Sequence, residues 1–357
     1  MPADEALDLL MPAEWAPHEA TWIAWPHNRS DWPGKMAVIP WVYGEIVRYL
    51  TRDEQVRILV PSATQAARAR KVLLRAGADL GRVQLLTWAT NRGWTRDYGP
   101  IFSVDRSSGK RRIVDFKFNA WARYPRWQKD NGIPARAAKY VSTDRTVAEY
   151  NGRQVVLEGG AIDVNGCGTL LTTEECLLDA KKQVRNPGFS AEDYEQVFRQ
   201  YFGVHQTIWL GKGIVGDDTH GHVDDICRFV NETTVVLVQE RDPQDANYRA
   251  LAENRERLQG VKIKKSPRAR PTSLTVIELP MPAPLYHDGV RLPASYANFY
   301  ISNAAILVPT FNDPQDRVAL GILADVFTDR PVIGIHAVDL VLGLGTLHCL
   351  TQQEPAG

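Results

Sequence analysis

The 357-residue chain lacks an excess of charge of either sign, because 42 Lys and Arg residues are balanced by 42 Asp and Glu residues. A chain without net charge generates no long-range field that would gather nucleic acid or an anionic membrane surface. The chain also lacks any apolar run near the roughly 20 residues that a membrane-spanning helix needs. We therefore expect neither nucleic acid nor a membrane as a partner and look for function in local sites.

Cysteine is scarce, and no two cysteines form a CxxC pair. The four are Cys167, Cys176, Cys227 and Cys349. This spacing argues against a disulfide framework and against a thiolate zinc site. The first residues, "MPADEALDLLMPAEW", are acidic and do not resemble the basic start of a secretory signal. We expect a cytoplasmic protein with free thiols.

Two kinds of segment alternate along the chain. Apolar residues recur at intervals of three and four in residues 35–53, 62–77, 190–202 and 242–260, which is typical of amphipathic helices. Short β-rich runs occupy residues 56–60, 83–88, 234–239, 275–280, 304–309 and 331–335. No low-complexity linker divides the chain, so we predict one domain, 1–357, of the α/β class.

Four segments share a weak internal pattern in which a polar cluster precedes an apolar strand, a turn and a second strand. Their lead residues are Asp97, Glu158, Asp224 and Asn298, spaced by roughly 60 to 75 residues. Repeated units around an axis would bring these lead residues together, although an ordinary α/β chain also contains hairpins. The Pro-rich residues 279–294 are the longest candidate loop, and we interpret them as a lid.

The segment "GDDTHGHVDDICRFV" places His220, His222 and Asp224 at alternate positions. On a strand, alternate residues point to one face, so the three side chains would form a single row. Such a row could ligate a divalent metal, or it could combine a proton-transfer histidine with a carboxylate that holds substrate. A purely structural polar row is a third interpretation.

A carboxylate also stands before Tyr-Gly-Pro at Asp97, and another follows an apolar run at Glu158. Cys349 is the candidate nucleophile, because a thiolate is a stronger nucleophile than a serine hydroxyl at neutral pH. Each residue alone has a structural interpretation, as an ion pair or a buried thiol. Carboxylates that converge on a thiol require a cation among them, and a guanidinium fits because it pairs bidentately with carboxylates.

At these residues the sequence resembles the agmatine deiminases, which group with the bacterial-type peptidylarginine deiminases in the guanidino-modifying, or pentein, superfamily. The matching stretches are "MPAEWAPHEATWIAWP", "WTRDYGP", "LEGGAIDVNGCGTLLTTEECLL", "GDDTHGHVDDICRFV", "ASYANFYISNAAILVP" and "HCLTQQ". They cover nearly the whole chain. The resemblance implies an α/β-propeller of five ββαβ-type units around a pseudo-fivefold axis.

The resemblance also implies roles for residues in these stretches, without a metal or another cofactor. The implied catalytic residues are Cys349 as nucleophile, His222 as general acid and base, Glu158 as the residue that orients this histidine, and Asp97 and Asp224 as the pair that holds the guanidinium. Trp94 is implied to line the substrate channel and Asn298 to lie near the site. A homodimer is the default assembly that the resemblance suggests.

The implied reaction converts agmatine and water to N-carbamoylputrescine and ammonia through a covalent amidino-thioether on Cys349. The row of Asp217, Asp218, Asp224 and Asp225 is anionic and favours a substrate with a cationic tail. Leu344 and Thr346 depart from the family pattern before the terminal His-Cys, which leaves the substrate open between agmatine, another guanidino compound and peptidyl-arginine. A metal-dependent amidohydrolase and a catalytically silent guanidino-binding protein are the remaining alternatives.

Overall fold

The computed structural model describes residues 8–266 and 268–357, in which helices and strands alternate. Its α-helices are α1 (Ile39–Leu50), α2 (Ala63–Ala76), α3 (Thr95–Tyr98), α4 (Gln128–Asn131), α5 (Ile133–Tyr140), α6 (Glu174–Leu178), α7 (Ala191–Phe202), α8 (Tyr248–Leu258), α9 (Pro314–Val326) and α10 (Leu347–Leu350). Four 3₁₀ helices are η1 (Leu80–Arg82), η2 (Gly159–Ala161), η3 (Val223–Asp225) and η4 (Leu340–Gly343). The predicted α/β class is confirmed.

Five sheets in the described residues contain three or four strands. The first sheet contains β1 (Leu9–Leu10), β5 (Ile101–Asp105), β6 (Arg111–Asp115) and β7 (Asp144–Val147). The second contains β10 (Asp163–Val164), β11 (Thr169–Thr173) and β12 (Gln206–Leu210), and the third contains β13 (Cys227–Asn231), β14 (Thr234–Gln239) and β17 (Thr275–Pro280). The fourth contains β20 (Tyr300–Ile301), β21 (Ile306–Thr310) and β22 (Val332–His336). The fifth joins β23 (Thr351–Pro355) near the end of the chain to β2 (His18–Ala24), β3 (Gln55–Leu59) and β4 (Val83–Leu86) near its start.

All five sheets share one pattern of strand directions. The antiparallel pairs are β5–β6, β10–β11, β13–β14, β20–β21 and β23–β2. The second strand of each pair then runs parallel to β7, β12, β17, β22 or β3, after a connection that contains at least one helix. The four hairpins predicted from the sequence are therefore present. The fifth pair was not predicted, because its two strands lie more than 300 residues apart.

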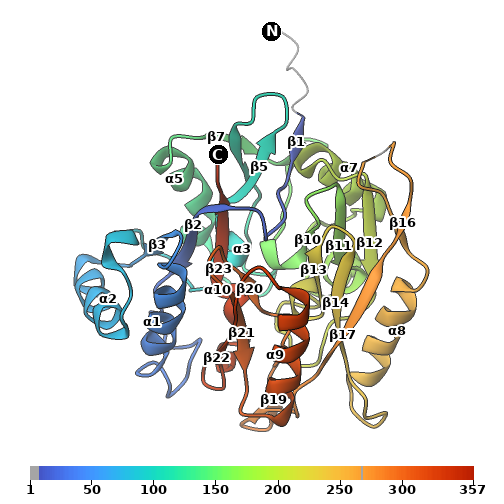
Figure 1. Ribbon diagram of the computed structural model, residues 1–357. Helices are drawn as coiled ribbons and strands as arrows, with labels where there is room; N and C mark the ends of the chain where they lie inside the picture. Colours follow the sequence, from blue (N-terminus) through green and yellow to red (C-terminus); the bar gives the residue numbers. More distant parts are fainter. Residues whose placement is uncertain (1–7, 267) are drawn as a thin grey trace, which may run out of the picture.

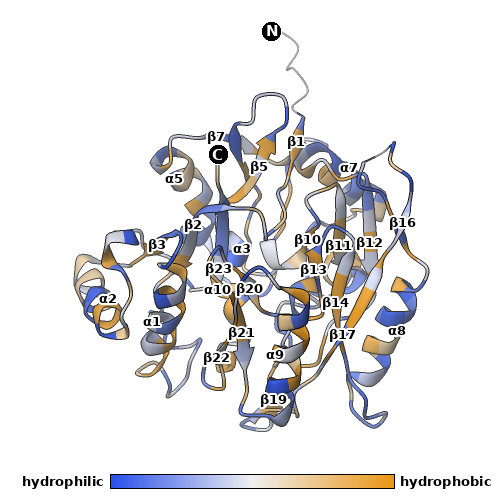
Figure 2. Ribbon diagram, viewed as in Figure 1, coloured by the Kyte–Doolittle hydropathy of each residue, from blue (hydrophilic) through white to orange (hydrophobic). Residues whose placement is uncertain are grey.

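Three two-stranded ribbons complete the described strands: β8 (Glu149–Tyr150) with β9 (Arg153–Gln154), β15 (Lys262–Ile263) with β16 (Thr272–Ser273), and β18 (Tyr286–His287) with β19 (Val290–Arg291). In Figure 1 the helices α2, α5, α7 and α8 lie at the periphery, whereas the short helices α3 and α10 lie near the middle. Strands such as β14 and β17 are hydrophobic, and the outer helices carry hydrophilic residues (Figure 2). Every residue of β14 is buried.

The helix ends follow local sequence signals. A capping box between Ser190 and Asp193 begins α7, and Gly203 in the left-handed region ends it. Helix α1 begins at Ile39, four residues later than predicted, and Pro40 occupies its first turn. Proline is tolerated there because the first-turn N–H groups have no intrahelical partner.

The starts of the five antiparallel pairs determine where the site lies. Helix α3 precedes β5, η2 precedes β10, η3 precedes β13, Asn298 precedes β20, and α10 precedes β23. Helix α3 contacts both α10 and η2, and η2 contacts η3. These contacts bring α3, η2, η3 and α10 together, and Asn298 bonds to Cys349 of α10, as the repeat interpretation predicted for its lead residues.

Two expectations about local structure were wrong. His220, His222 and Asp224 do not lie on a strand, because His220 has a positive φ of 67° and His222 is the N-cap of η3; strand β13 starts only at Cys227. The Pro-rich residues 279–294 include the end of β17 and the ribbon of β18 and β19, and none of them lines the catalytic cavity described below.

No helix in the described part of the chain is long and apolar enough to cross a membrane.

Candidate active site

Cys349 lies in the short helix α10 at the wall of a cavity of about 290 Å³. Its thiol accepts a hydrogen bond from Nδ2 of Asn298 at 3.1 Å and donates to Oδ2 of Asp224 at 3.6 Å. Burial raises the pKa of Cys349 well above its ordinary value, and the negative charges of Asp224, Asp225 and Asp97 raise it further. The thiol therefore carries its proton when no cation is present.

Asp97 lies in α3 and faces the same cavity. Its Oδ2 accepts the indole N–H of Trp121 at 2.9 Å, and its Oδ1 accepts the backbone N–H of Gly160 at 3.1 Å. Burial raises its pKa to about 6, against the opposing effect of the charge of His222. A carboxylate that burial destabilises in this way gains most from a cationic ligand.

Asp224 is held by His348, the residue before the candidate nucleophile. Nδ1 of His348 lies 2.7 Å from Oδ2 of Asp224, and its Nε2 lies 2.7 Å from Oε2 of Glu14. Burial tends to raise the pKa of Asp224, but the hydrogen bond from His348 and its charge hold the pKa below its ordinary value. The Oδ1 atom of Asp224 has no hydrogen-bond partner.

Glu14 is in turn fixed by Arg228 at 3.0 Å and Arg96 at 3.1 Å. Burial raises the pKa of Glu14, but Arg228, His348 and Arg96 outweigh it, so that the pKa lies well below its ordinary value. Asp224 is therefore the end of a buried, hydrogen-bonded chain of charges. Such a chain keeps one carboxylate ionised in a place where burial favours its neutral form.

His222 is fully buried between three carboxylates. Its Nδ1 lies 3.8 Å from Asp97 and 4.0 Å from Asp224, and its Nε2 lies 3.7 Å from Glu158. Neither ring nitrogen has a hydrogen-bond partner. Burial lowers the pKa of His222, but the charge of Asp97 and the contacts with Cys176 and Glu158 outweigh it and raise the pKa well above its ordinary value.

Glu158 precedes η2 and pairs with Arg185, whose Nε lies 3.1 and 3.3 Å from its two carboxylate oxygens. Burial raises the pKa of Glu158, but Arg185 and His222 outweigh it and lower the pKa. The loop that carries His222 is held by Asp217, which accepts the backbone N–H groups of Gly221 and His222 at 2.7 and 3.1 Å. Glu158 is therefore ionised, and its carboxylate lies beside Nε2 of the imidazole.

Gly160 permits this close packing. A Cβ atom at this position would lie 2.5 Å from Nδ1 of His222 and 2.9 Å from Oδ1 of Asp97. Gly343 and Gly345 do the same for Trp94, whose ring would lie 2.6 and 2.9 Å from their added Cβ atoms. Only glycine allows the backbone to approach these groups so closely.

Asn298 connects the nucleophile to the neighbouring segment. Its Nδ2 donates to Asp225 at 3.0 Å as well as to Cys349, and its Oδ1 accepts from Thr346 at 2.7 Å and from the backbone of His348 at 3.1 Å. Burial raises the pKa of Asp225 well above its ordinary value, followed by the charges of Asp224 and Asp217. Asn298 therefore links the nucleophile to Asp225 and to the segment that contains Thr346 and His348.

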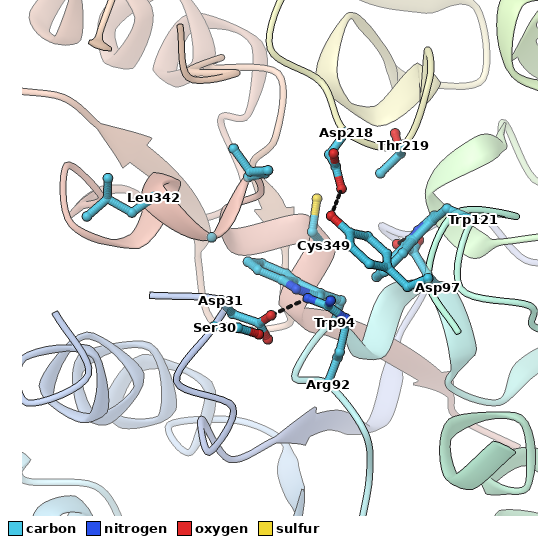
Figure 3. Close-up of a pocket in the computed structure, with 13 residues that line it drawn as sticks. Ser30, Asp31, Arg92, Trp94, Asp97, Trp121, Asp218, Thr219, Leu342 and Cys349 are labelled. Atoms are coloured by element: carbon cyan, nitrogen blue, oxygen red, sulfur yellow. Dashed lines mark hydrogen bonds and ion pairs between the residues drawn. The ribbon is translucent and has the colours of Figure 1, made fainter. Parts of the chain in front are cut away.

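Aromatic and polar side chains form the walls of the cavity around Cys349 (Figure 3). Its lining includes Cys349, Asp97, Trp94, Trp121, Tyr124, Asp218, Arg92, Asp31 and Leu342–Leu344. The Tyr124 hydroxyl donates to Asp218 at 2.5 Å, and Arg123 pairs with the other oxygen of Asp218 at 3.1 Å. Asp218 therefore presents a carboxylate to the same cavity as Cys349.

The structure brings together all eight residues that the resemblance and the acidic row had singled out. Cys349, Asp97, Trp94 and Asp218 line the cavity, and His222, Glu158, Asp224 and Asn298 are buried around its inner end. Of the acidic row expected to face the substrate tail, Asp218 alone lines the cavity among its four members, because Asp217 binds backbone and Asp224 and Asp225 are buried.

Sequence reasoning missed the residues that hold the site from outside. Arg185 and Glu14 act across 27 and 334 residues of chain, on Glu158 and His348 respectively, and nothing in the local sequence marks them. His348 had a signal, because it adjoins Cys349. Trp121 lies in a turn with positive φ, which the sequence pattern does not reveal.

The metal interpretation of His220, His222 and Asp224 is wrong in its geometry. His220 faces away from the other two, with Nε2 at 2.8 Å from Asp179. Two other groups within the described residues have donor atoms within 4.8 Å of one another, namely Glu158 with Cys176 and His222, and Asp224 with Asp225 and Cys349. In each group one carboxylate already has a protein partner. Glu158 pairs with Arg185, and Asp224 is bonded to His348.

Residues 10–355 match the model of the Porphyromonas-type peptidyl-arginine deiminase family. The chain belongs to this family. It is 36% identical over 369 residues to the agmatine deiminase of Stutzerimonas stutzeri (strain A1501) and 37% identical over 376 residues to that of Pseudomonas aeruginosa (strain LESB58). Each alignment covers 97% of this chain and 95% of the relative.

Solved structures agree with this membership. An agmatine deiminase of C. jejuni with substrate bound superposes with a TM-score of 0.85 at 29% identity and covers 98% of this chain and 97% of its own. The agmatine deiminase of Enterococcus faecalis also gives 0.85, at 30% identity, with 98% and 96% covered. The resemblance predicted from the sequence is confirmed, and with it a hydrolase of the agmatine deiminase type that acts on C–N bonds of amidines.

Proposed function

We propose that this family member is a guanidine deiminase that converts agmatine and water to N-carbamoylputrescine and ammonia through a covalent intermediate on Cys349. One observation carries the proposal: the thiol, two carboxylates and one imidazole converge, buried, at the inner end of a single cavity. A guanidinium is planar and cationic, and it donates hydrogen bonds in two directions. It therefore matches a space bounded by Asp97 and Asp224.

In the proposed complex Asp97 and Asp224 hold the guanidinium with its central carbon facing the sulfur of Cys349. The bound cation favours the ionised forms of both carboxylates and of the thiol, which reverses the causes that raise the pKa of Cys349 in the free enzyme. Substrate binding thus favours loss of the thiol proton to solvent and generates the nucleophile. A free thiol that stays protonated is also protected from side reactions.

In the first step the Cys349 thiolate attacks the guanidinium carbon and forms a tetrahedral adduct. His222 donates a proton to the departing nitrogen, the C–N bond breaks, and ammonia leaves. The remaining amidino-thioether is cationic and stays between Asp97 and Asp224. The raised pKa of His222 supports this role, because the imidazole must enter the step with its proton.

In the second step water attacks the same carbon and His222 takes its proton. The C–S bond then breaks and returns the Cys349 thiolate, and the new hydroxyl group loses its proton to solvent as the ureido product is released. We propose that Glu158, fixed by Arg185, orients His222 in both steps and stabilises its protonated form. The water replaces the ammonia lost in the first step, so the sum is one hydrolysis.

The outer cavity supports a substrate with a short cationic tail. Asp218 offers a carboxylate in the cavity wall, and Trp94 offers an apolar face for methylene groups of the tail. We further propose that residues 1–357 form one catalytic domain of five ββαβ-type units around a pseudo-fivefold axis, which the shared strand pattern of the five sheets supports. The cytoplasmic location and the homodimer stay predictions.

The substrate is tested by measuring ureido product from agmatine, free arginine and an arginine peptide at equal concentration. We expect the highest kcat/KM for agmatine and a loss of roughly tenfold or more for Asp218→Asn, since one charge contact to the tail is removed. Asp53→Asn, an exposed change outside the cavity, is the control. A preference for the peptide in the wild-type enzyme would replace agmatine by peptidyl-arginine and leave the reaction class intact.

A further inference from the structure

A second cavity adjoins the catalytic one. It measures about 490 Å³ and shares three wall residues, Ser30, Arg92 and Tyr124, with the catalytic cavity. Arg92 and Ser30 are seen at the edge of the catalytic cavity in Figure 3. We call this second cavity the vestibule, because it adjoins the catalytic cavity at these three residues.

The charged side chains that line the vestibule are all basic. Arg29, Arg126 and Lys129 are exposed and form no ion pair with any described residue, and no Asp or Glu lines the cavity. The fourth cation, Arg92, is balanced by an ion pair with the buried Asp31. Three cations therefore remain without a counter-charge around one concave surface, in a protein whose net charge is zero.

The polar groups beside these cations are arranged consistently with a site for an anion. Both ring nitrogens of His27 face backbone carbonyl oxygens, Nδ1 toward Trp25 at 2.9 Å and Nε2 toward Thr90 at 3.1 Å, so the ring has no free acceptor to offer a ligand. Asp130, which accepts the backbone N–H of the wall residue Asn91, is itself buried, and burial raises its pKa to about 7. Its ability to neutralise the vestibule is correspondingly weak.

We propose that the vestibule binds an oxyanion, a carboxylate or a phosphate, through Arg29, Arg126 and Lys129. Oxyanions accept charge-assisted hydrogen bonds from guanidinium and ammonium groups, and a concave wall of one sign concentrates them. Two successive side-chain contacts connect the vestibule wall to Asp218 in the catalytic cavity. The guanidinium carbon of Arg92 lies 4.1 Å from the ring centre of Tyr124, and the hydroxyl of Tyr124 binds Asp218.

The anion can come from two sources, a free ion in solution or an acidic group attached to the far end of a guanidino ligand. Both present the same chemistry to the three cations. The first source makes the vestibule a site for a small effector, and the second makes it an extension of the substrate site. The site itself does not depend on the proposed deiminase reaction, because binding is measurable without turnover.

Calorimetric titration of the full-length protein with inorganic phosphate, at an ionic strength held constant with chloride, tests the site. We expect saturable binding that weakens roughly tenfold or more in the double variant Arg126→Gln/Lys129→Gln, because two charge contacts are lost. The matched control is Arg68→Gln/Lys71→Gln, which removes two exposed cations from helix α2 and should leave binding unchanged. No saturable binding, or equal binding by the two double variants, would overturn the proposal.

The source of the anion is decided by inhibition of agmatine turnover with two arginine dipeptide amides, Arg-Asp and Arg-Asn. A lower inhibition constant for Arg-Asp that disappears in Arg126→Gln/Lys129→Gln shows that the anion belongs to the guanidino ligand. Equal inhibition by both, together with phosphate binding, shows that it is a free ion. Intact agmatine turnover without phosphate binding would refute the vestibule site alone, whereas phosphate binding without any ureido product would refute the proposed function alone.

Discussion

At the scale of single residues, the site places more negative charge around Cys349 than a thiol tolerates as a thiolate. Asp97 and Asp225 respond by a raised pKa, whereas Asp224 is kept ionised by His348. In the free enzyme the thiol of Cys349 is therefore protonated, and the raised pKa values of Asp97 and Asp225 favour the protonated forms of these acids. A cationic guanidinium changes the balance for every one of these groups at once, so affinity and activation have the same cause.

The ionisation of Asp97 predicts a pH dependence. Its pKa of about 6 means that the carboxylate able to hold a guanidinium forms as the pH rises through 6, so kcat/KM for agmatine should rise over the same range. Trp121 lowers this pKa through its indole N–H. Trp121→Phe should therefore move the acidic limb to higher pH, whereas Trp127→Phe, outside the catalytic cavity, should not. An unmoved limb in Trp121→Phe would show that another group governs it.

At the scale of elements, the important feature is the short segment in front of each antiparallel pair. These segments are too short to be stable alone and take their shape from side-chain hydrogen bonds and from glycines that remove steric obstacles. Segment η2 is packed closely against the site, because a Cβ atom added to Gly160 would clash with both His222 and Asp97.

Gly160→Ala is expected to lower kcat/KM for agmatine by about a hundredfold or more, because a displacement of catalytic groups by even 1 Å has effects of that size. The matched control is Gly321→Ala in helix α9, where an added Cβ meets no atom within 4 Å. That change should leave kcat/KM unaltered and raise the free energy of unfolding by up to about 1 kcal/mol. Near-normal activity of Gly160→Ala would contradict the close packing of η2 against the imidazole.

The hairpins could be predicted from the sequence more fully than the loops between them. Alternating β-rich runs and turn residues predicted the pairs β5–β6, β10–β11, β13–β14 and β20–β21, because that information is local. The row of His220, His222 and Asp224 failed, since a positive φ at His220 breaks the alternation and no local pattern signals it. The roles of Glu14 and Arg185 depend on contacts between distant segments and could not be read from either segment.

At the scale of the whole molecule, the chain closes on itself. Strand β23 pairs with β2 and thereby joins the segment after Cys349 to the sheet of β2, β3 and β4. Glu354 fixes this closure, because its carboxylate accepts from the indole of Trp22 at 2.8 Å and pairs with Arg57 at 2.8 Å and Arg111 at 3.0 Å. The position of the nucleophile therefore depends on contacts made by both ends of the chain.

Glu354→Ala should lower the free energy of unfolding by about 3 kcal/mol, because it leaves the mostly buried Arg57 and the indole of Trp22 without their partner. Glu45→Ala removes an exposed carboxylate 3.5 Å from Arg48 and should cost no more than about 0.5 kcal/mol. Urea unfolding of both variants provides the comparison. Equal stabilities would mean that Glu354 does not hold the closure.

The most direct test of the account is intact-protein mass analysis after rapid acid quenching of a reaction with agmatine, followed by peptide mapping. The wild-type enzyme should show an adduct on Cys349 with the mass of agmatine less one ammonia, and Cys349→Ala should show neither adduct nor ureido product while still binding agmatine. Cys167→Ala, which removes a thiol outside the catalytic cavity, should behave as the wild type. Substantial ureido formation by Cys349→Ala would contradict the central claim.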